Sequence, residues 1–358
     1  MKNSKNVLKY LFGQKSFKNL NGFVSEKLGT DSNYSAVYFI DSFFKDKNIL
    51  DIDIKKNDKI IYVPTIDEPT TDYIDSVYQE IIFTNNPTGI VVGIGGGITL
   101  DTAKAISNLL TNGGRAEDYQ GWDLVKVPGI YKIGIPTISG TGAEASRTCV
   151  MTNTKNGLKL GMNSEYTLYD QLILDPELTS TVPRNQYFYT GMDTYIHCIE
   201  SLNGNFRNAI ADAFSEQALK LSRDVFSDND MKNERCREKL MVASYLGGSA
   251  IGNSFVGVVH PFSAGLSVVL KLHHGIANCI AMSAMSEFYP RETEEFLFLA
   301  EKQKIEIPKN ICKNLTDTQY ETLYNSTIIH EKPLSNALGE NFKNILTKEK
   351  VVEIFKRM

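Results

Sequence analysis

The sequence predicts a two-domain protein in which an α/β domain with a parallel sheet precedes an all-helical domain. Three observations predict this fold class. At 358 residues the chain is too long for one typical hydrophobic core. Its first half alternates short β-rich apolar runs with stretches of helical pattern, which is typical of a parallel sheet. Beyond Pro183 the strand signal disappears and only helical patterns remain.

Four apolar runs in the first half predict buried strands. They are rich in β-branched residues and end at Asp, Pro or Gly, and they cover residues 36–40, 60–63, 89–93 and 132–135. Five later segments predict helices, at residues 185–202, 208–226, 234–247, 276–288 and 291–304. Because Pro183 can start the first of these helices, we place the boundary between residues 179 and 184, with domains of residues 1–182 and 183–358.

A glycine-rich turn follows the third predicted strand. Gly95, Gly96 and Gly97 separate that strand from a helical pattern that contains Asp101. Glycines let the backbone approach a phosphate, and the first N–H groups of a helix attract negative charge, so the segment suits a pyrophosphate. The spacing is not Gly-x-Gly-x-x-Gly, because Ile98 stands in place of the last glycine. A tight strand-to-helix turn explains the glycines equally well.

The strand that ends at Pro136 is also followed by small hydroxyl and glycine residues. Thr137, Ser139 and Thr141 can offer hydroxyl groups to a phosphate or a ribose. This second segment favours the phosphate-binding interpretation of the first.

Four of the five histidines fall in two short segments and, with Asp193, indicate one divalent-metal site. Asp193 and His197 are four residues apart in a helical pattern, so they lie on one helix face. The other segment supplies His260, His273 and His274. A carboxylate with imidazoles suits Zn²⁺ or Fe²⁺ better than Ca²⁺. A single helical histidine is usually structural, but clustering in a chain so poor in histidine favours a ligand set.

Composition narrows the remaining function classes. A net charge of −4 argues against nucleic acid or an anionic membrane as the principal partner. The five cysteines are scattered without Cys-x-x-Cys spacing, as reduced thiols of a cytosolic protein are. No apolar signal core follows the basic N-terminus, and no run approaches the ~20 residues of a membrane span. We therefore expect a soluble, cytoplasmic protein that acts on a small molecule. We also expect it to be a homodimer.

Taken in order, these motifs resemble the iron-containing, group III alcohol dehydrogenases. The resemblance runs from residue 10 to about residue 282. It is carried by Gly95-Gly-Gly-x-x-x-Asp101-x-Ala-Lys104, Pro136-Thr-x-x-Gly-Thr-Gly-x-Glu144, Asp175-Pro176, Gly191-x-Asp193-x-x-x-His197-x-x-Glu200, His260 and His274-Gly275-x-Ala277-Asn278. It implies an N-terminal nucleotide-binding domain, a helical C-terminal domain and an active cleft between them, in a fold related to that of dehydroquinate synthase.

The resemblance also implies roles for single residues. The metal, Fe²⁺ or Zn²⁺, would be held by Asp193, His197, His260 and His274. Asp41 corresponds to the acid that hydrogen-bonds the adenosine ribose, and its charge would repel a 2′-phosphate, so we expect NAD rather than NADP. A turn or helix cap is the alternative for Asp41. The expected cofactor-binding residues are Asp41, Gly95, Gly96, Gly97, Asp101, Thr137, Ser139, Thr141 and Lys159, and the expected catalytic residues are His273, Asp193 and His274.

Two features depart from the common pattern of this family. Members commonly carry a second histidine four residues after the third ligand, where this chain has Ala264. His273 is a candidate substitute for the proton relay, and the alternative is that it only supports the site or is exposed. The short C-terminal region, with His260-Pro-Phe-Ser-Ala-Gly and the pair His273-His274, most resembles the branch that contains 3-deoxy-D-manno-octulosonate (Kdo) 8-oxidase, which serves amino-sugar synthesis for lipopolysaccharide.

Three hypotheses follow for the reaction. The first is oxidation of the 8-hydroxyl of that sugar acid, and the second is a dehydrogenase or reductase for small alcohols and aldehydes. In both, a metal at the alcohol oxygen favours loss of the hydroxyl proton, and a nicotinamide accepts hydride. The third is a metal-dependent lyase of the dehydroquinate-synthase fold, which the pairing of Asp193 with His197 on one helix disfavours. Arg207 and Lys271 are candidates to bind a substrate carboxylate.

Overall fold

The computed structural model describes residues 4–29, 33–47, 50–66, 68–84 and 86–358, so the first three residues of the basic N-terminus lie outside the described residues. Contacts between residues divide the chain into two compact units. The first consists of Met1–Ile138 with Ala143–Ser180, and the second of Ser139–Gly142 with Thr181–Met358. The short segment 139–142 thus belongs with the helical part of the chain, which no sequence pattern indicates.

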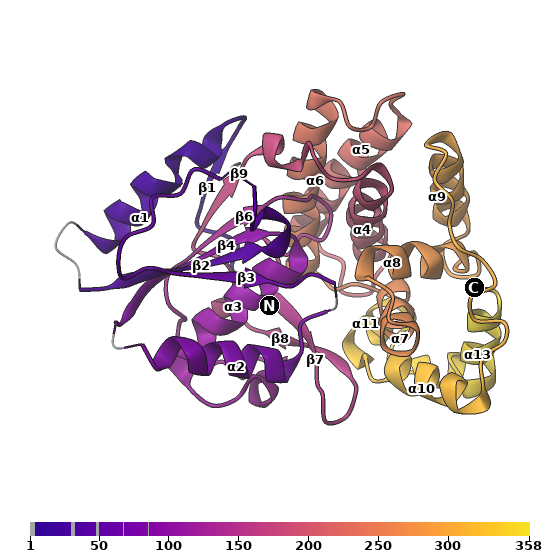
Figure 1. The fold of residues 1–358 in the computed structure, drawn as a ribbon. Helices are drawn as coiled ribbons and strands as arrows, with labels where there is room; N and C mark the ends of the chain where they lie inside the picture. Colours follow the sequence, from indigo (N-terminus) through magenta and orange to yellow (C-terminus); the bar gives the residue numbers. More distant parts are fainter. Residues whose placement is uncertain (1–3, 30–32, 48–49, 67, 85) are drawn as a thin grey trace. The chain divides into compact units, whose positions relative to one another are not determined.

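The first unit is built on a six-stranded parallel sheet (Figure 1). The strand order is β1 (Lys9–Phe12), β9 (Gln171–Leu174), β6 (Lys132–Pro136), β4 (Thr88–Gly95), β2 (Ser35–Asp41) and β3 (Lys59–Val63). The predicted runs correspond to β2, β3, β4 and β6, so the α/β fold with a parallel sheet is confirmed. The sequence pattern does not indicate β1 and β9, because each has four residues and β1 is an edge strand with mostly exposed side chains.

Helices cover both faces of this sheet. Figure 1 shows α1 (Leu20–Leu28) on one side and α2 (Thr71–Ile82) and α3 (Gly97–Asn112) on the other. Successive side chains of β2 pack alternately on the two faces of the sheet. Tyr38 packs in the cluster that contains Leu20 of α1, whereas Val37 and Phe39 pack in the cluster that contains Ile106 of α3. Because both faces are buried, the strands read as continuous apolar runs.

A smaller three-stranded sheet belongs to the same unit. Its order is β5 (Gly121–Trp122), β8 (Lys159–Asn163) and β7 (Thr148–Thr152), and β7 runs antiparallel to β8. Several side chains of these strands are polar and only partly buried, so the sequence gives no strand signal there.

The second unit is helical, and its described residues form no strand. It comprises α4 (Arg184–Leu202), α5 (Ala209–Ser227), α6 (Glu234–Asn253), α7 (Val259–Leu270), α8 (His274–Ser283), α9 (Pro290–Lys302), α10 (Asp317–Ile328), α11 (Glu331–Leu338), α12 (Phe342–Ile345) and α13 (Lys348–Lys356). Helix α4 packs against α5, α6 and α8, and α7 packs against α8 and α10. The five predicted helices correspond to α4, α5, α6, α8 and α9, so the helical class of this half is confirmed.

The helices differ from the prediction at several ends. Helix α6 continues past Gly247 to Asn253, although glycine weakens a helix interior. Helix α8 ends at Ser283, short of the predicted residue 288. The sequence pattern does not predict α7, where Pro261 lies in the first turn and so removes no helical hydrogen bond. The helices α10 to α13 were not predicted either, because the last predicted helix ends at residue 304.

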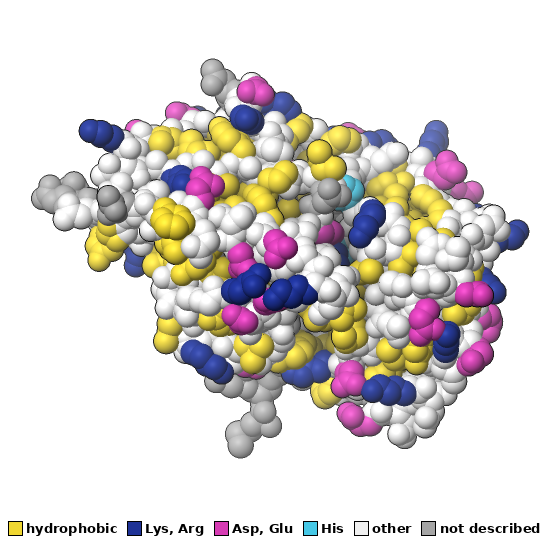
Figure 2. Space-filling model, turned by 60° about the horizontal axis from the view of Figure 1, so that its bottom comes forward, with side chains coloured by type: hydrophobic (Ala, Val, Ile, Leu, Met, Phe, Trp, Pro, Cys, Tyr) yellow, Lys and Arg dark blue, Asp and Glu magenta, His cyan; other side chains and the backbone are white. Residues whose placement is uncertain are grey.

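None of the helices in the described part of the chain is long and apolar enough to cross a membrane. On the face shown in Figure 2, basic and acidic side chains are intermixed, in keeping with the small net charge.

Candidate metal centre

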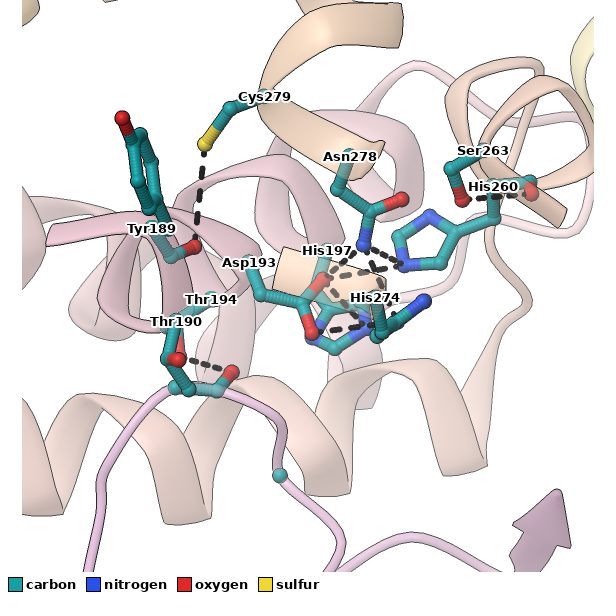
Figure 3. A network of polar contacts seen from close by, with 12 residues as sticks. Tyr189, Thr190, Asp193, Thr194, His197, His260, Ser263, His274, Asn278 and Cys279 are labelled. Atoms are coloured by element: carbon teal, nitrogen blue, oxygen red, sulfur yellow. Dashed lines mark hydrogen bonds and ion pairs between the residues drawn. The ribbon is translucent and has the colours of Figure 1, made fainter. Parts of the chain in front are cut away.

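Three of the four predicted ligands form a tight cluster within the second unit. Asp193 of α4, His260 of α7 and His274 of α8 each offer a ligand atom, and these atoms lie within 4.8 Å of one another. The His260 Nε2 lies 3.2 Å from Asp193 Oδ1, and the His274 Nε2 lies 3.4 Å from Asp193 Oδ2. Figure 3 shows the imidazoles directed toward the Asp193 carboxylate. Helix α4 and the consecutive helices α7 and α8, which follow it more than fifty residues later, therefore converge on one buried carboxylate.

His197 lies beside this cluster. Its Nε2 is 3.5 Å from Asp193 Oδ1, because the two residues are one helical turn apart on α4. Its ring stacks on that of His260, with centroids 4.7 Å apart and planes inclined by 12°. Its Nδ1 is buried without a hydrogen-bond partner among the described residues. The predicted set of four is thus brought together in space.

Two further residues belong to the cluster, although neither was among the predicted site residues. Asn278 donates from Nδ2 to Asp193 Oδ1 at 2.6 Å, and the same nitrogen lies 3.1 Å from His274 Nε2. Glu200 contacts His260 Nδ1 through Oε2. Both stand in the motifs that carry the family resemblance. The usable signal is spacing, because Glu200 follows His197 by three residues and Asn278 follows His274 by four, each on the ligand's own helix face.

Burial and mutual charge set the protonation of the cluster. Burial lowers the pKa of His197 to about 3, despite the attraction of Asp193. Burial also opposes ionisation of Asp193, but the interactions of this carboxyl with the surrounding histidines outweigh burial and hold its pKa well below its usual range. Burial opposes charging of His260, and the carboxylates of Glu200 and Asp193 raise its pKa to about 10. An anionic carboxylate is therefore held among imidazoles, one of which is strongly basic.

This donor set fits a divalent transition metal. One carboxylate oxygen and imidazole nitrogens are the ligands that Zn²⁺ and Fe²⁺ accept, whereas Ca²⁺ requires mostly oxygens. The buried Asp193 Oδ2 lacks a hydrogen bond from the described residues, which leaves an anionic oxygen available for a cation. Asn278 and Glu200 supply the outer hydrogen bonds that metal-binding carboxylates and histidines normally have.

His273, the candidate proton relay, lies next to this cluster in sequence. It is the residue before α8, its side chain is exposed, and His274 begins the helix. An exposed imidazole can exchange protons with solvent, as a proton relay must. The same exposure fits the alternative that His273 is a surface residue without a role in catalysis. Its proposed role remains a prediction.

The glycine-rich turn lies where β4 meets α3. Gly96 caps α3 and Gly97 is the first residue of that helix. A Cβ at Gly95 would lie 2.6 Å from the Thr99 side chain, and one at Gly96 would lie 2.9 Å from Ile138. Close packing thus explains two of the glycines. The turn also presents the N-terminus of a sixteen-residue helix, as anion binding requires.

The segment 139–142 packs tightly on helices of the second unit. Gly140 has φ +142°, and a Cβ there would lie 1.7 Å from the Thr190 carbonyl oxygen. The N–H groups of Gly140 and Gly142 both donate to Ser244 Oγ of α6. The glycines of this motif are therefore required by packing, and Ser139 and Thr141 remain its candidates for contacting a cofactor. Thr137 precedes the segment and donates its N–H to the Gly95 carbonyl.

The remaining predicted cofactor residues form hydrogen bonds or ion pairs with other residues of the first unit. Asp41 ends β2, and its carboxylate accepts hydrogen bonds from Phe43 N and Thr65 Oγ1, so the helix-cap alternative is realised. Asp101 forms an ion pair with the buried Lys104 at 2.9 Å and accepts from Val150 N. Lys159, on β8, is nearly buried and forms an ion pair with Glu68 at 3.0 Å. These contacts give Asp101 and Lys159 structural roles as well.

Comparison with known proteins places this architecture among enzymes of one family. A family model described as iron-containing alcohol dehydrogenase matches residues 8–176, and the C-terminal model of the Fe-containing alcohol dehydrogenase family matches residues 187–328. The sulfoacetaldehyde reductase of Bilophila wadsworthia is 38% identical over 63% of this chain and 56% of its own length. The NAD-dependent methanol dehydrogenase of Bacillus methanolicus is 35% identical over 62% of this chain and 58% of its own length. The matches thus span a little over half the length of these relatives.

Solved structures agree in fold over the whole chain. A 1,3-propanediol oxidoreductase has a TM-score of 0.84 at 20% identity, covering 99% of both chains. The sulfoacetaldehyde reductase from Bifidobacterium kashiwanohense, solved with NAD⁺, has a TM-score of 0.80 at 21% identity, covering 99% of this chain and 98% of that one. At these identities the likeness shows the fold alone, and the family models carry the assignment. The chain belongs to the iron-containing alcohol dehydrogenase family.

Proposed function

We propose that this protein is a metal-dependent, NAD-linked oxidoreductase that interconverts a primary alcohol and an aldehyde. The observation that carries the proposal is that His260 and His274, with His197 beside them, converge on the buried carboxylate of Asp193. Membership of the family supports the same reaction class. It also favours an alcohol dehydrogenase over the lyase hypothesis.

In this proposal the four residues hold one Fe²⁺ or Zn²⁺. A divalent metal in such a site supplies positive charge that favours loss of the proton from an alcohol hydroxyl. Asp193 contributes the only negative ligand, and Asn278 fixes one of its oxygens by a hydrogen bond. His273, exposed before α8, is proposed to pass the proton to solvent.

NAD is the proposed hydride acceptor. The N-terminus of α3, with Gly95, Gly96 and Gly97, would bind the pyrophosphate, and Asp41 would accept hydrogen bonds from the adenosine ribose. A related sulfoacetaldehyde reductase has been solved with NAD⁺, and a curated relative is NAD-dependent in name. The other proposed cofactor contacts are Asp101, Thr137, Ser139, Thr141 and Lys159.

Two substrate classes compete within this function. The sugar-acid hypothesis, oxidation of the 8-hydroxyl of Kdo, is supported by Ala264. That residue lies one turn after His260 on α7, where a small side chain leaves room near the metal site. The curated relatives are named for small substrates, among them sulfoacetaldehyde, methanol and 1,3-propanediol, which favours the second class.

An anionic substrate would require a basic partner. Arg207 is already paired with Asp212 through Nε at 2.9 Å and donates to the Leu202 carbonyl. Lys271 is exposed at the end of α7, three residues before His274. We therefore propose Lys271 rather than Arg207 as the candidate contact for a carboxylate or sulfonate.

The experiment is a steady-state comparison on the purified protein loaded with Fe²⁺ or Zn²⁺. Alcohols and Kdo are tested with NAD⁺, and sulfoacetaldehyde and small aldehydes with NADH. The proposed function predicts metal-dependent turnover in at least one class, and no turnover by the metal-loaded protein would reject it. Ala264→His should lower kcat/KM for Kdo more than for short alcohols if the sugar acid is the substrate. A higher kcat/KM for the short substrates in the wild type would reject the sugar-acid hypothesis. The expected homodimer and cytoplasmic location remain predictions.

A further inference from the structure

We propose that Glu200 is a positioning residue that keeps a proton of His260 on Nδ1, so that Nε2 is the nitrogen that binds the metal. The inference rests on the metal site of the proposed function. Glu200 is fully buried on α4. Its Oε2 contacts His260 Nδ1, and its Oε1 accepts the Val259 N–H at 2.6 Å. One carboxylate thus holds both the ring of His260 and the backbone just before it.

The two ring nitrogens of His260 have different surroundings. Nδ1 faces the carboxylate of Glu200, and Nε2 faces the metal cluster, 3.2 Å from Asp193 Oδ1. An ionised carboxylate can only accept a hydrogen bond, so the nitrogen beside it must carry the proton. When a metal binds, the other nitrogen is then the unprotonated one. Glu200 therefore decides which nitrogen can act as the ligand.

The fold places Glu200 for this purpose. It lies three residues after His197 and seven after Asp193, so the same face of α4 carries two proposed ligands and the residue that orients a third. Val259 is the first residue of α7, where a negative charge is favourable and the first N–H groups need acceptors. A neutral oxygen would satisfy that N–H as well. A buried carboxylate is costly to desolvate, and only its histidine contact requires an acceptor without a proton.

Glu200→Gln separates the orienting role from the capping role. The amide oxygen can still accept the Val259 N–H, but the amide NH₂ then faces His260 Nδ1. Two donors cannot face each other, so His260 would adopt the other tautomer, with its proton on Nε2. Glu200→Ala removes both contacts, so the proton of His260 can lie on either ring nitrogen. We expect Glu200→Gln to melt at a higher temperature than Glu200→Ala, yet to bind Zn²⁺ no more tightly. Both should lose about 10- to 100-fold in Zn²⁺ affinity.

Asp175→Asn is the matched control. Asp175 is a buried carboxylate that accepts the N–H groups of Lys15 and Phe17 and contacts no histidine in the described structure. This variant should lower the melting temperature and leave the Zn²⁺ dissociation constant unchanged. The constants are measured by competition with a chromophoric chelator. In the Zn²⁺-loaded wild type, ¹⁵N spectra of the histidine rings should show the His260 proton on Nδ1.

Wild-type Zn²⁺ affinity in Glu200→Gln would overturn the inference, as would affinities that follow the order of melting temperatures. A His260 ring protonated on Nε2 in the loaded wild type would overturn it too. A wild type that binds Zn²⁺ tightly but oxidises no alcohol and reduces no aldehyde rejects the proposed function and leaves the role of Glu200 standing. A wild type that binds no divalent metal rejects both.

Discussion

The side chains of the metal cluster differ in how deeply they are buried and in how many partners they contact. Asp193 is fully buried and contacts His260, His274 and Asn278, so its replacement would disturb several partners at once. The His274 side chain is 31% exposed, and the His260 side chain is 12% exposed. Replacing either histidine removes a proposed ligand from the edge of the cluster without opening a large internal cavity.

We expect His260→Ala and His274→Ala to abolish catalysis and to weaken metal binding by more than about 100-fold, since removal of an outer partner alone costs about 10- to 100-fold. The fold should persist, as judged by circular dichroism. His330→Ala is the control, because His330 precedes α11 away from the cluster in sequence. Full metal content and turnover in either ligand variant would show that the metal site is wrongly assigned.

Asp41 is a residue where capping and cofactor recognition can be separated. Asp41→Asn keeps an oxygen for the Phe43 N–H but removes the charge, whereas Asp41→Gly removes both. If charge repels a 2′-phosphate, both variants should lower the ratio of kcat/KM for NAD to that for NADP. An unchanged ratio in both would leave Asp41 as a cap of the 3₁₀ turn after β2.

At the scale of elements, the segment 139–142 shows how packing dictates sequence. Helix α6 carries a glycine at position 248 because this residue lies against the backbone of the segment, where a Cβ would approach Gly142 O to 2.4 Å. Thr194 of α4 donates to the Gly140 carbonyl at 2.8 Å. Segment 139–142 is therefore held by two helices, one of which carries Asp193 and His197.

Gly140→Ala should destabilise the protein by more than about 3 kcal/mol, because its φ of +142° disfavours any side chain and the new Cβ would overlap the Thr190 carbonyl. Gly157→Ala is the control. Gly157 has φ +71° with open space around its Cβ position, so the cost should be about 1–2 kcal/mol. Chemical denaturation measures both values. Equal losses would mean that the segment can move away from α4.

At the scale of the whole molecule, metal binding should stabilise the helical unit. The proposed ligands come from α4, α7 and α8, so one ion would hold the consecutive helices α7 and α8 against α4, which lies much earlier in the sequence. Binding to the folded state alone adds free energy of unfolding by mass action, about 2.7 kcal/mol at a free metal concentration 100 times the dissociation constant. Metal removal should therefore lower the melting temperature as well as activity.

The stabilisation by metal should grow with pH. The pKa of His260 is raised to about 10, so at lower pH a proton must leave this residue before Nε2 can bind a metal. The apparent affinity should rise by about tenfold per pH unit for one displaced proton, up to pH 10. Scanning calorimetry at a fixed free Zn²⁺ concentration, at two pH values below 10, measures the metal-induced shift in melting temperature. A metal-induced shift that is equal at both values, or smaller at the higher one, would contradict the assignment of His260.

The fold class, the helical character of the second half and the family could all be predicted from the amino-acid sequence. These features rest on short-range patterns: continuous apolar runs for strands covered on both faces, helical periodicity, and residues spaced by one helical turn, such as Asp193 and His197. Such spacing is fixed by the geometry of a single element, so it can be read without knowledge of its neighbours. The expectation that His260 and His274 join that pair followed from the resemblance.

Contacts between distant parts of the chain explain which residues surround the ligands and why certain glycines are required. Glu200 and Asn278 become partners of the cluster only when α4, α7 and α8 come together. The short strands β1 and β9 exist because neighbouring chain supplies their hydrogen-bond partners, not because four residues carry a strand signal. Gly140 is required by the Thr190 carbonyl, fifty residues away. Contacts between distant segments leave no periodicity in the sequence, which is why local patterns could not reveal them.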